Sequence, residues 1–528
     1  LHNVAHSFPT RRSSDLRLAL TARIDDGGET IEPARAIDDP FILARWRKDV
    51  QAQRAALKQT QDELGSIEAR LWREYPRYME LDDPRPVSVD DLRRSVLRPG
   101  EHLLAYFRLK NQLLIFMVAP DDFRLVRVPV ERKELDALVA QVRKPMEAGG
   151  RIDALAELDP EVLHRLYSLL LEPVRDALPK RGNLLVIGDG PLYTLPLEML
   201  VTHWSAADRQ TFEKARKPDL SQYATLDYAG AHWRFSYAPS LAALAIQRAA
   251  ATRPGKAEFE KSLIAFADPV FQSNDATPGA ATRSLLQSLG AMRGDQVSIP
   301  RLPETADEVN AVAAIVGGRH TLLLREAAQE SRVKHDDLSA ARYLHFATHG
   351  LLSGDFARLK DYVGDSATAA SGTRNIVIED VDEAPLEAAS TQGQPALVLT
   401  LVGDLGGEDG LLTMNEVMGL KMNADLVVLS ACNTAGERVD ARNGEGFAGL
   451  TRAFMHAGAR GLLVSHWSVE SLATRDLITD FFRRRQTGAA TAEALSGAQA
   501  DIRGSRDARL QLSRAHPFFW APFVHVGE

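Results

Sequence analysis

Two apolar segments of the chain each end on a residue that could do chemistry. Residues 343–350 read YLHFATHG, where His349 precedes a glycine, and residues 425–436 read DLVVLSACNTAG, which contains Cys432, the only cysteine of the chain. A thiol becomes a nucleophile when a nearby imidazole accepts its proton, and the near-neutral pKa of histidine suits it to act as that base. Together, with the histidine first, the segments predict a Cys–His pair for acyl transfer.

Taken singly, each segment also has a simpler interpretation. A histidine that follows a strand often makes only structural hydrogen bonds, and a small buried cysteine at a strand end is often inert. His345 lies inside the first strand, so we expect it to pack rather than to react. The combination of both segments, and neither one alone, favours a reactive site.

The elements that must position this pair follow an α/β pattern. Apolar strands are predicted at 262–266, 321–324, 343–347, 425–430, 461–465 and 523–526, with a strand or hairpin at 395–401. Helices are predicted between them at 304–316, 327–338 and 444–457, with two more before the last strand. This alternation predicts a mostly parallel sheet covered by helices on both faces, with function beyond the carboxyl ends of its strands.

The preceding part of the chain has a different pattern. Three β-rich runs between Glu101 and Val130 predict antiparallel strands joined by tight turns. Helices are expected at 131–144, where Pro145 interrupts the pattern, and at 160–177, and a buried strand at 183–187. The polar stretch 202–232 is expected to be an exposed loop.

The N-terminal part contains a heptad stripe of apolar residues, weakened by two polar positions and ended by Pro76. Its members are Leu43, Trp46, Val50, Gln53, Leu57, Thr60, Leu64, Ile67 and Leu71. We expect a long helix that packs on its own protein, with a dimeric coiled coil as the alternative. Residues 1–16, LHNVAHSFPTRRSSDL, resemble the translation of a sequencing adapter, so we expect them to be disordered and to pack against nothing.

These patterns predict four parts: residues 1–16, a helical segment at 17–95, a non-catalytic α/β lobe at 96–255 and a catalytic domain at 256–528. The 63 basic and 71 acidic side chains leave a net charge of -8, which argues against a general nucleic-acid or membrane-surface binder. No apolar stretch reaches the roughly 20 residues needed to span a bilayer. A lone cysteine excludes an internal disulfide, and we expect a cytoplasmic protein.

Several motifs occur in the order in which one known family has them. They are HFATHG, VVLSACNTAGE, Gly444-Glu445-Gly446, Ala459-Arg460-Gly461 and the terminal HPFFWA, preceded by GDGPL at 188–192, YAPS at 237–240, ADP at 267–269 and LPET at 302–305. On these motifs the chain resembles, over roughly residues 150–528, the CHAT family. These are caspase-like domains found with tetratricopeptide repeats, in the clan of caspases and separase.

The resemblance implies a caspase-like three-layer α/β/α sandwich and a role for each matching residue. His349 would be the general base and Cys432 the nucleophile, and the backbone N–H groups of Gly350 and Cys432 would stabilise the oxyanion. Asp268 would line the pocket for a basic substrate residue, although an Asp-Pro turn is an equal alternative, and Trp467 is a further expected substrate contact. No cofactor and no metal ion is expected.

The implied function is that of a cysteine endopeptidase of restricted specificity, acting on a protein or peptide and controlled by upstream helical or repeat regions. The N-terminal helix could bind a regulatory protein. The alternative is a caspase-like scaffold or peptide-binding sensor module that cleaves little. Residues 361–394, rich in Gly, Ser, Thr and Ala, are expected to form a mobile loop near the site.

Overall fold

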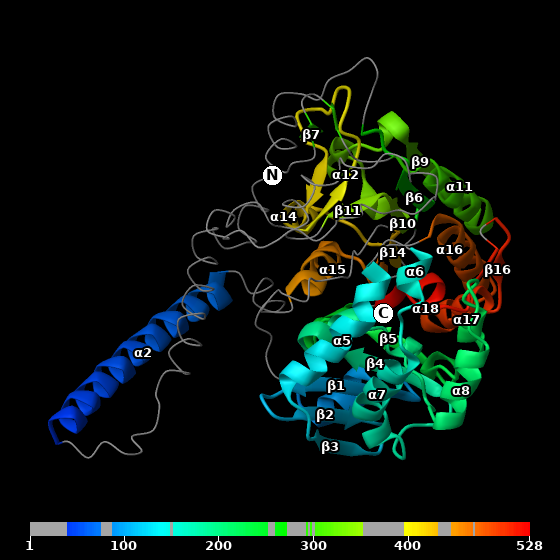
Figure 1. Cartoon of the computed structure of the whole chain (residues 1–528). Coiled ribbons are helices and arrows are strands. Elements are labelled where there is room, and N and C mark those ends of the chain that lie inside the picture. The colour runs from blue at the N-terminus through cyan, green and yellow to red at the C-terminus, as the bar shows by residue number, and fades with distance from the viewer. Residues whose placement is uncertain are drawn as a thin grey trace. The chain divides into compact units, whose positions relative to one another are not determined.

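The computed structural model of the chain falls into two units, residues 1–87 and residues 88–528. Within the part that the structure describes, the first unit contains one helix and the second contains a large sheet with its covering helices (Figure 1). The described residues are 40–74, 87–147, 151–251, 259–271, 292–293, 296–297, 301–351, 395–430, 445–467, 470–509 and 511–528.

The helix of the first unit is α2 (Pro40–Glu74), which is 35 residues long. Thr60 and Leu71 of the predicted stripe are buried, and Leu57, Leu64 and Ile67 are half-buried, whereas most of the described side chains between them are exposed. The long helix is therefore confirmed, and the described stripe residues from Leu57 to Leu71 are less exposed than their neighbours, whereas the packing partner of the stripe stays a prediction. Residues 1–16 and Pro76 lie outside the described residues.

An eleven-stranded sheet organises the second unit. Its strand order is β3-β2-β1-β4-β5-β18-β15-β14-β10-β6-β9. The bounds are β1 (Glu101–Arg108), β2 (Leu113–Val118), β3 (Phe123–Val128), β4 (Gly182–Ile187), β5 (Trp233–Tyr237), β6 (Lys261–Ala267), β9 (His320–Leu324), β10 (Ala341–Ala347), β14 (Leu426–Leu429), β15 (Gly461–Ser465) and β18 (Phe523–Gly527).

Parallel pairing joins all neighbours in this sheet except β3–β2, β2–β1 and β15–β18, which are antiparallel. The strands β9, β6, β10, β14 and β15 therefore run in one direction, and β18, β5, β4 and β1 run in the other. The C-terminal strand β18 joins the two groups. The predicted α/β class with a mostly parallel sheet is confirmed, as is the antiparallel β1–β2–β3 meander.

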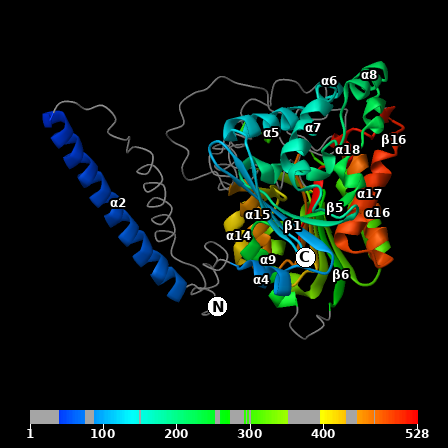
Figure 2. The same cartoon turned by 90° about the horizontal axis from the view of Figure 1, so that it is seen from below.

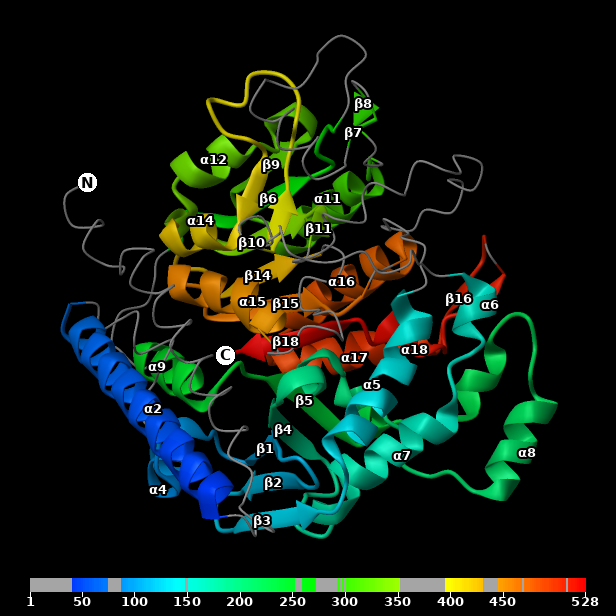
Figure 3. The same ribbon diagram turned by 60° about the vertical axis from the view of Figure 1, so that its left-hand side comes forward.

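Helices cover both faces of the sheet. On one face α11 (Glu304–Val316), α16 (Ser471–Gln486) and α17 (Thr491–Arg503) pack side by side, and α9 (Leu241–Ala251) and α15 (Glu445–Ala457) lie on the other (Figures 2 and 3). The remaining helices are α4 (Val89–Asp91), α5 (Arg132–Glu147), α6 (Ile152–Leu155), α7 (Pro160–Leu170), α8 (Ala206–Lys214), α12 (Glu330–His335), α14 (Met414–Gly419) and α18 (Pro517–Trp520).

Among the described residues, three small sheets accompany the large one. The strands β11 (His349–Leu351), β12 (Ala396–Val398) and β13 (Leu411–Thr413) form an antiparallel sheet in that order. Two short antiparallel pairs join β7 (Met292–Arg293) to β8 (Gln296–Val297) and β16 (Arg506–Asp507) to β17 (Leu512–Ser513). Of the two alternatives predicted for residues 395–401, the strand is confirmed, because this range contains β12 and its antiparallel partner β13 lies further along the chain.

Two expectations from the sequence are wrong. The helix α5 continues through Pro145 to Glu147, and the proline is tolerated because it lies in the last turn with its ring buried. The stretch 202–232 is not a simple exposed loop, because it contains α8, begun by a Ser205–Asp208 capping box, and two fully buried tyrosines, Tyr223 and Tyr228. The Tyr223 hydroxyl donates to the Leu158 carbonyl at 2.7 Å, which satisfies its polar group inside the core.

The hydrophobic core of the second unit is continuous across the sheet. Its largest fully buried side chains include Trp233, Trp467 and Trp520, which come from both of the lobes predicted from the sequence. The predicted boundary near residue 255 stays a prediction, since the sheet continues across it. None of the described helices has the length and apolar composition needed to cross a membrane.

Candidate functional site

The strand that leads to His349 and the strand that leads to Cys432 are neighbours. β10 and β14 are parallel, with Tyr343 opposite Leu426 and Phe346 opposite Leu429. Beyond β14, the Ser430 N–H donates to the Phe346 carbonyl at 2.9 Å. The carboxyl ends of parallel neighbours lie at one edge of a sheet, which is where α/β proteins place their sites.

Immediately after β10 the chain leaves the large sheet. His349 begins β11 and lies opposite Val398 of β12, and the hydroxyl of the preceding Thr348 donates to the Val398 carbonyl. Both Thr348 and His349 are 0% exposed. Val398 of β12 therefore pairs with His349 and also accepts the hydroxyl of the residue before it.

A second loop at this edge supplies an aromatic contact to the histidine. Residues 268–271 follow β6, which is the neighbour of β10 on its other side. The rings of Phe271 and His349 have their centroids 5.4 Å apart and are tilted by 51°. Phe271 is 1% exposed, so its ring forms a buried wall beside the imidazole.

Asp268 lies at the carboxyl end of β6, as the sequence predicted, but its carboxylate has a partner within the chain. Arg301 donates from Nε to Oδ1 at 2.8 Å and from Nη2 to Oδ2 at 2.6 Å. Asp268 has a φ of 48°, and its N–H donates to the Thr305 hydroxyl at 2.8 Å. A basic substrate group could use this carboxylate only by displacing or sharing Arg301.

Trp467 has a core position. Its side chain is 1% exposed, and its indole N–H donates to the Phe518 carbonyl at 3.2 Å. The structure gives this residue a packing role, because a substrate could not reach a ring so enclosed without a rearrangement. Its predicted contact with substrate stays a prediction.

His345 packs, as expected. Its Nε2 lies 3.0 Å from Glu308 Oε1 of α11, and both side chains are 0% exposed. This bond ties β10 to the helix that covers it. Gly350 lies opposite Leu397 in β12, and its role as an oxyanion donor stays a prediction.

Cys432 and the loop at 361–394 lie outside the described residues. The described chain reaches Ser430 on one side of the cysteine and resumes at Glu445, where α15 begins. The Cys432–His349 pair therefore stays a prediction, as does the mobile loop.

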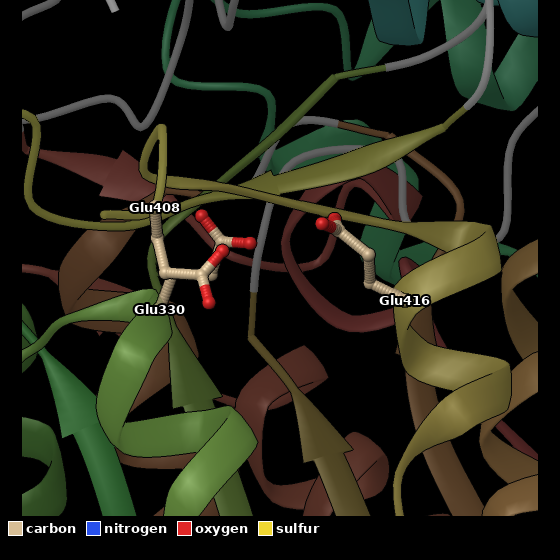
Figure 4. Close-up of side chains that lie close together, drawn as sticks. All are labelled: Glu330, Glu408 and Glu416. Carbon is tan, nitrogen blue, oxygen red and sulfur yellow. The ribbon is translucent and has the colours of Figure 1, made fainter. Parts of the chain in front are cut away.

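Beside this region, three carboxylates converge on one ammonium group. Glu330 of α12, Glu408 and Glu416 of α14 point toward one another (Figure 4), and Lys334 Nζ lies 2.6, 2.5 and 2.7 Å from their nearest oxygens. Burial raises the pKa of the Glu330 carboxyl, and the three carboxylates hold the pKa of the Lys334 ammonium above its usual range. The single lysine offsets one of the three carboxylate charges and lies between all three side chains.

Sequence reasoning missed the residues that surround His349. Phe271 and Thr400 carry no motif of their own, although Phe271 directly follows the ADPV sequence after β6 and the Thr400 segment follows β12. The Asp268–Arg301 pair joins residues 33 positions apart. No local pattern signals such a pair, because it is set by how loops meet at the sheet edge.

A cavity of about 180 Å³ lies elsewhere, at α5 and α7. It is lined by Gln141, Val142, Lys144, Pro145, Glu157, Leu158, Asp159 and Val162. It contains none of the predicted site residues. Its position gives no reason to move the candidate site away from the carboxyl edge of β10 and β14.

Comparison with known sequences places most of the chain in one family. The model described as "CHAT domain" matches residues 160–528. Tetratricopeptide repeat protein 28 of Homo sapiens is 24% identical over 384 residues, which are 69% of this chain and 13% of that protein. The Mus musculus protein of the same name is 27% identical over 238 residues, or 43% of this chain and 9% of that protein. The chain thus spans a small part of the length of these relatives.

Solved structures also match the chain, with low sequence identity. The separase–securin complex of Saccharomyces cerevisiae matches with a TM-score of 0.40 and 9% identity, covering 89% of this chain and 34% of that chain. The complex of the pro- and mature domains of RgpB from Porphyromonas gingivalis matches with a TM-score of 0.33 and 9% identity, covering 75% of this chain and 77% of that chain.

Proposed function

Because the chain belongs to the CHAT family, we propose that it is a cysteine endopeptidase in which Cys432 attacks the substrate and His349 is the base. One observation carries the proposal: β10 and β14 are parallel neighbours, and Ser430, two residues before the cysteine, is bonded to Phe346, three residues before the histidine. Chain connectivity from these two points allows the thiol and the imidazole to meet above one edge of the sheet.

The reaction would be acyl transfer in two steps. The His349 imidazole takes the proton of the Cys432 thiol, and the thiolate adds to the scissile carbonyl carbon. The N–H groups of Gly350 and Cys432 would donate to the oxyanion, and the imidazolium returns the proton to the leaving amine. Water, deprotonated by His349, then hydrolyses the thioester, which releases the acid and restores the thiol.

The substrate would be a protein or peptide. We keep Asp268 as a candidate contact for a basic side chain because it lies one strand away from β10 at the same edge. Its ion pair with Arg301, whose side chain is 40% exposed, limits that role to a substrate that can take the place of the arginine. A cytoplasmic location, and control by a protein that contacts α2, complete the proposal.

A second candidate function is a peptide-binding scaffold or sensor that cleaves little. The observation that favours it is the burial of His349, which is 0% exposed and enclosed by Phe271 and β12. A base so enclosed can serve a substrate only after the site opens. The two candidates differ in thiol chemistry, because a scaffold has no need of an activated thiolate.

The single cysteine makes a direct test possible, since any thiol alkylation reports on Cys432 alone. A free thiol with a pKa of about 8.5 reacts several hundredfold more slowly at pH 6 than at pH 9. A thiolate–imidazolium pair keeps most of its reactivity at pH 6. We expect wild-type protein to be alkylated by iodoacetamide at comparable rates at both pH values, and His349→Ala to show the steep dependence of a free thiol.

Cleavage is tested in parallel with a peptide library and full-length protein. Products that appear with wild type and not with Cys432→Ala would support the endopeptidase. Equal alkylation of wild type and His349→Ala at pH 6 would refute the dyad. A free-thiol profile for wild type, together with peptide binding but no cleavage, would favour the scaffold.

A further inference from the structure

Thr400 lies where three loops of the carboxyl edge meet. Its hydroxyl donates to the Arg325 carbonyl at 2.6 Å and accepts the Val270 N–H at 3.1 Å, and its own N–H donates to the Ala328 carbonyl at 2.9 Å. These partners follow β9 and β6, whereas Thr400 itself follows β12. The side chain is 0% exposed, so water does not compete for these bonds.

The same segment holds the loop that carries Phe271. The Leu401 N–H donates to the Val270 carbonyl at 3.0 Å, so residues 400 and 401 bind both backbone groups of Val270. Phe271 is the next residue, and its ring lies against the His349 imidazole. The position of that ring therefore depends on the Thr400 hydroxyl.

The segment that contains β12 and Thr400 thus contacts His349 both directly and through Phe271. Val398, two residues before Thr400, pairs with His349 across β11 and β12 and accepts the Thr348 hydroxyl. The histidine backbone is thus fixed by β12 directly, and its ring is limited by Phe271, which β12 fixes through Thr400. One strand and its following residues set both the place of the histidine and the space that its ring can occupy.

We propose that Thr400 is a positioning residue for His349, acting through Val270 and Phe271. This inference rests on the proposed function, in which His349 must accept a proton from Cys432. A proton transfer needs the two heavy atoms within hydrogen-bond reach, and a misplacement of about 1 Å can cost about a hundredfold in rate. The hydroxyl holds the wall against which the imidazole rests, so its loss allows the ring to turn away from the thiol.

The test compares variants that remove or keep the hydroxyl of residue 400 and change little else. Thr400→Val keeps the shape of the side chain but leaves the Val270 N–H and the Arg325 carbonyl without their partner, and Thr400→Ser restores the hydroxyl. Phe271→Leu removes the ring without touching the bonds of Thr400. Thr479→Val is the matched control, because Thr479 is also a buried threonine, and its hydroxyl bonds only within α16, to the Arg475 carbonyl and to the Asp476 carbonyl at 3.2 Å.

The readout is the ratio of the Cys432 alkylation rates at pH 6 and pH 9, which a change in stability alone does not move in folded protein. We expect Thr400→Val and Phe271→Leu to lower this ratio by about a hundredfold relative to wild type. Thr400→Ser and Thr479→Val should keep the wild-type ratio. Circular dichroism of each variant establishes that the compared proteins are folded.

A second readout separates this inference from the proposed function. The imidazole NMR signal of His349, assigned by its loss in His349→Gln, should change in Thr400→Val and Phe271→Leu and stay in place in Thr400→Ser. A free-thiol profile in wild type would refute the dyad, and the imidazole signal would still decide whether Thr400 positions the ring. The inference is overturned if folded Thr400→Val and Phe271→Leu keep both the wild-type ratio and the wild-type signal, or if valine and serine at 400 have equal effects.

Discussion

Replacement of Lys334 by methionine tests whether one ammonium group holds the loops beside the site together. In the wild type, Lys334 Nζ lies within 2.7 Å of an oxygen of Glu330, Glu408 and Glu416. The three glutamates come from α12, from the loop before β13 and from α14, so the lysine joins the hairpin that pairs with β11 to its surroundings. Methionine keeps the unbranched stem and removes the charge.

The expected loss follows from how deeply each partner is buried. Removal of one partner of a buried ion pair costs about 3–5 kcal/mol, because the remaining charge is left without compensation. Exposed pairs contribute only about 0–1 kcal/mol. The Glu330 side chain is 1% exposed, whereas those of Glu408 and Glu416 are 23% and 31% exposed. We therefore expect Lys334→Met to lower the free energy of unfolding by about 3 kcal/mol at pH 7.5, near the lower end of the buried range.

The sign of the pH dependence is also fixed. Burial already raises the pKa of the Glu330 carboxyl in the wild type. Without the ammonium, mutual repulsion raises the pKa of the carboxyls in the folded variant further above the unfolded value of about 4.3. At pH values between the unfolded pKa and the raised folded pKa, the folded variant binds more protons than the unfolded chain. The stability of the variant therefore rises as pH falls. In the wild type, the raised pKa of Lys334 gives a stabilisation that is complete below about pH 10 and lost only above it. The difference in the free energy of unfolding between wild type and variant should therefore be largest near neutral pH and smaller at pH 5.5.

Urea unfolding at pH 5.5 and 7.5, followed by circular dichroism and tryptophan fluorescence, measures this deficit. Coincidence of the two signals is required before free energies are compared. Lys334→Met/Glu416→Gln is the control, since it removes one of the repelling charges and should recover part of the loss at pH 7.5. A deficit that is equal at both pH values, or below about 0.5 kcal/mol at pH 7.5, would refute the reasoning, because a surface substitution costs about that much.

Three further predictions concern the dyad and two buried acids. Cys432→Ala and His349→Ala should each abolish peptide cleavage, with a double variant hardly worse than either, as measured by product formation; full cleavage by folded Cys432→Ala would place the chemistry elsewhere. Burial raises the pKa of Glu198 to about 7, so wild-type stability should fall as pH rises from about 4.5 to 7, and Glu198→Gln should lack this slope in urea unfolding. Arg248 binds Glu101 through two buried bonds of 2.5 and 2.9 Å. Arg248→Met should therefore lower the free energy of unfolding by about 3–5 kcal/mol, and Arg248→Met/Glu101→Leu should recover most of this loss in urea unfolding. Equal losses in both variants would contradict this prediction.

The sequence predicted well those elements whose pattern is local. Short β-rich runs separated by turn residues predicted β1, β2 and β3, and apolar runs predicted β10, β14 and β15, because composition and apolar runs are properties of neighbouring residues. His345 was correctly expected to pack, since a residue inside a strand between apolar neighbours faces the core. The location of the candidate site could be predicted in the same way, because the point where an apolar run stops in the sequence marks the carboxyl end of a strand.

What the sequence could not predict depends on contacts between distant segments. Arg301 binds Asp268 and Thr400 binds Val270 only because loops after different strands meet at one edge. Trp467 follows a strand as a site residue would, yet the Phe518 carbonyl accepts its N–H inside the core. Pro145 lies within α5 and is buried there, despite the low helix propensity of proline.

The direction of the strands explains why the candidate site lies where it does. β6, β10, β14 and β15 present their carboxyl ends at one edge, whereas β1, β4 and β5 run the opposite way and present theirs at the other. The β1–β5 half can therefore reach the edge of the candidate site only through its helices and loops. The buried Arg143 of α5 does this, because it donates to the Thr194 carbonyl at 2.9 Å and to the carbonyl of His466, directly after β15, at 3.0 Å. The Arg143 guanidinium thus binds one carbonyl from each half of the sheet at this edge. It links the end of β15 to the N-terminal half, so both lobes predicted from the sequence hold the end of β15 in place beside the candidate site.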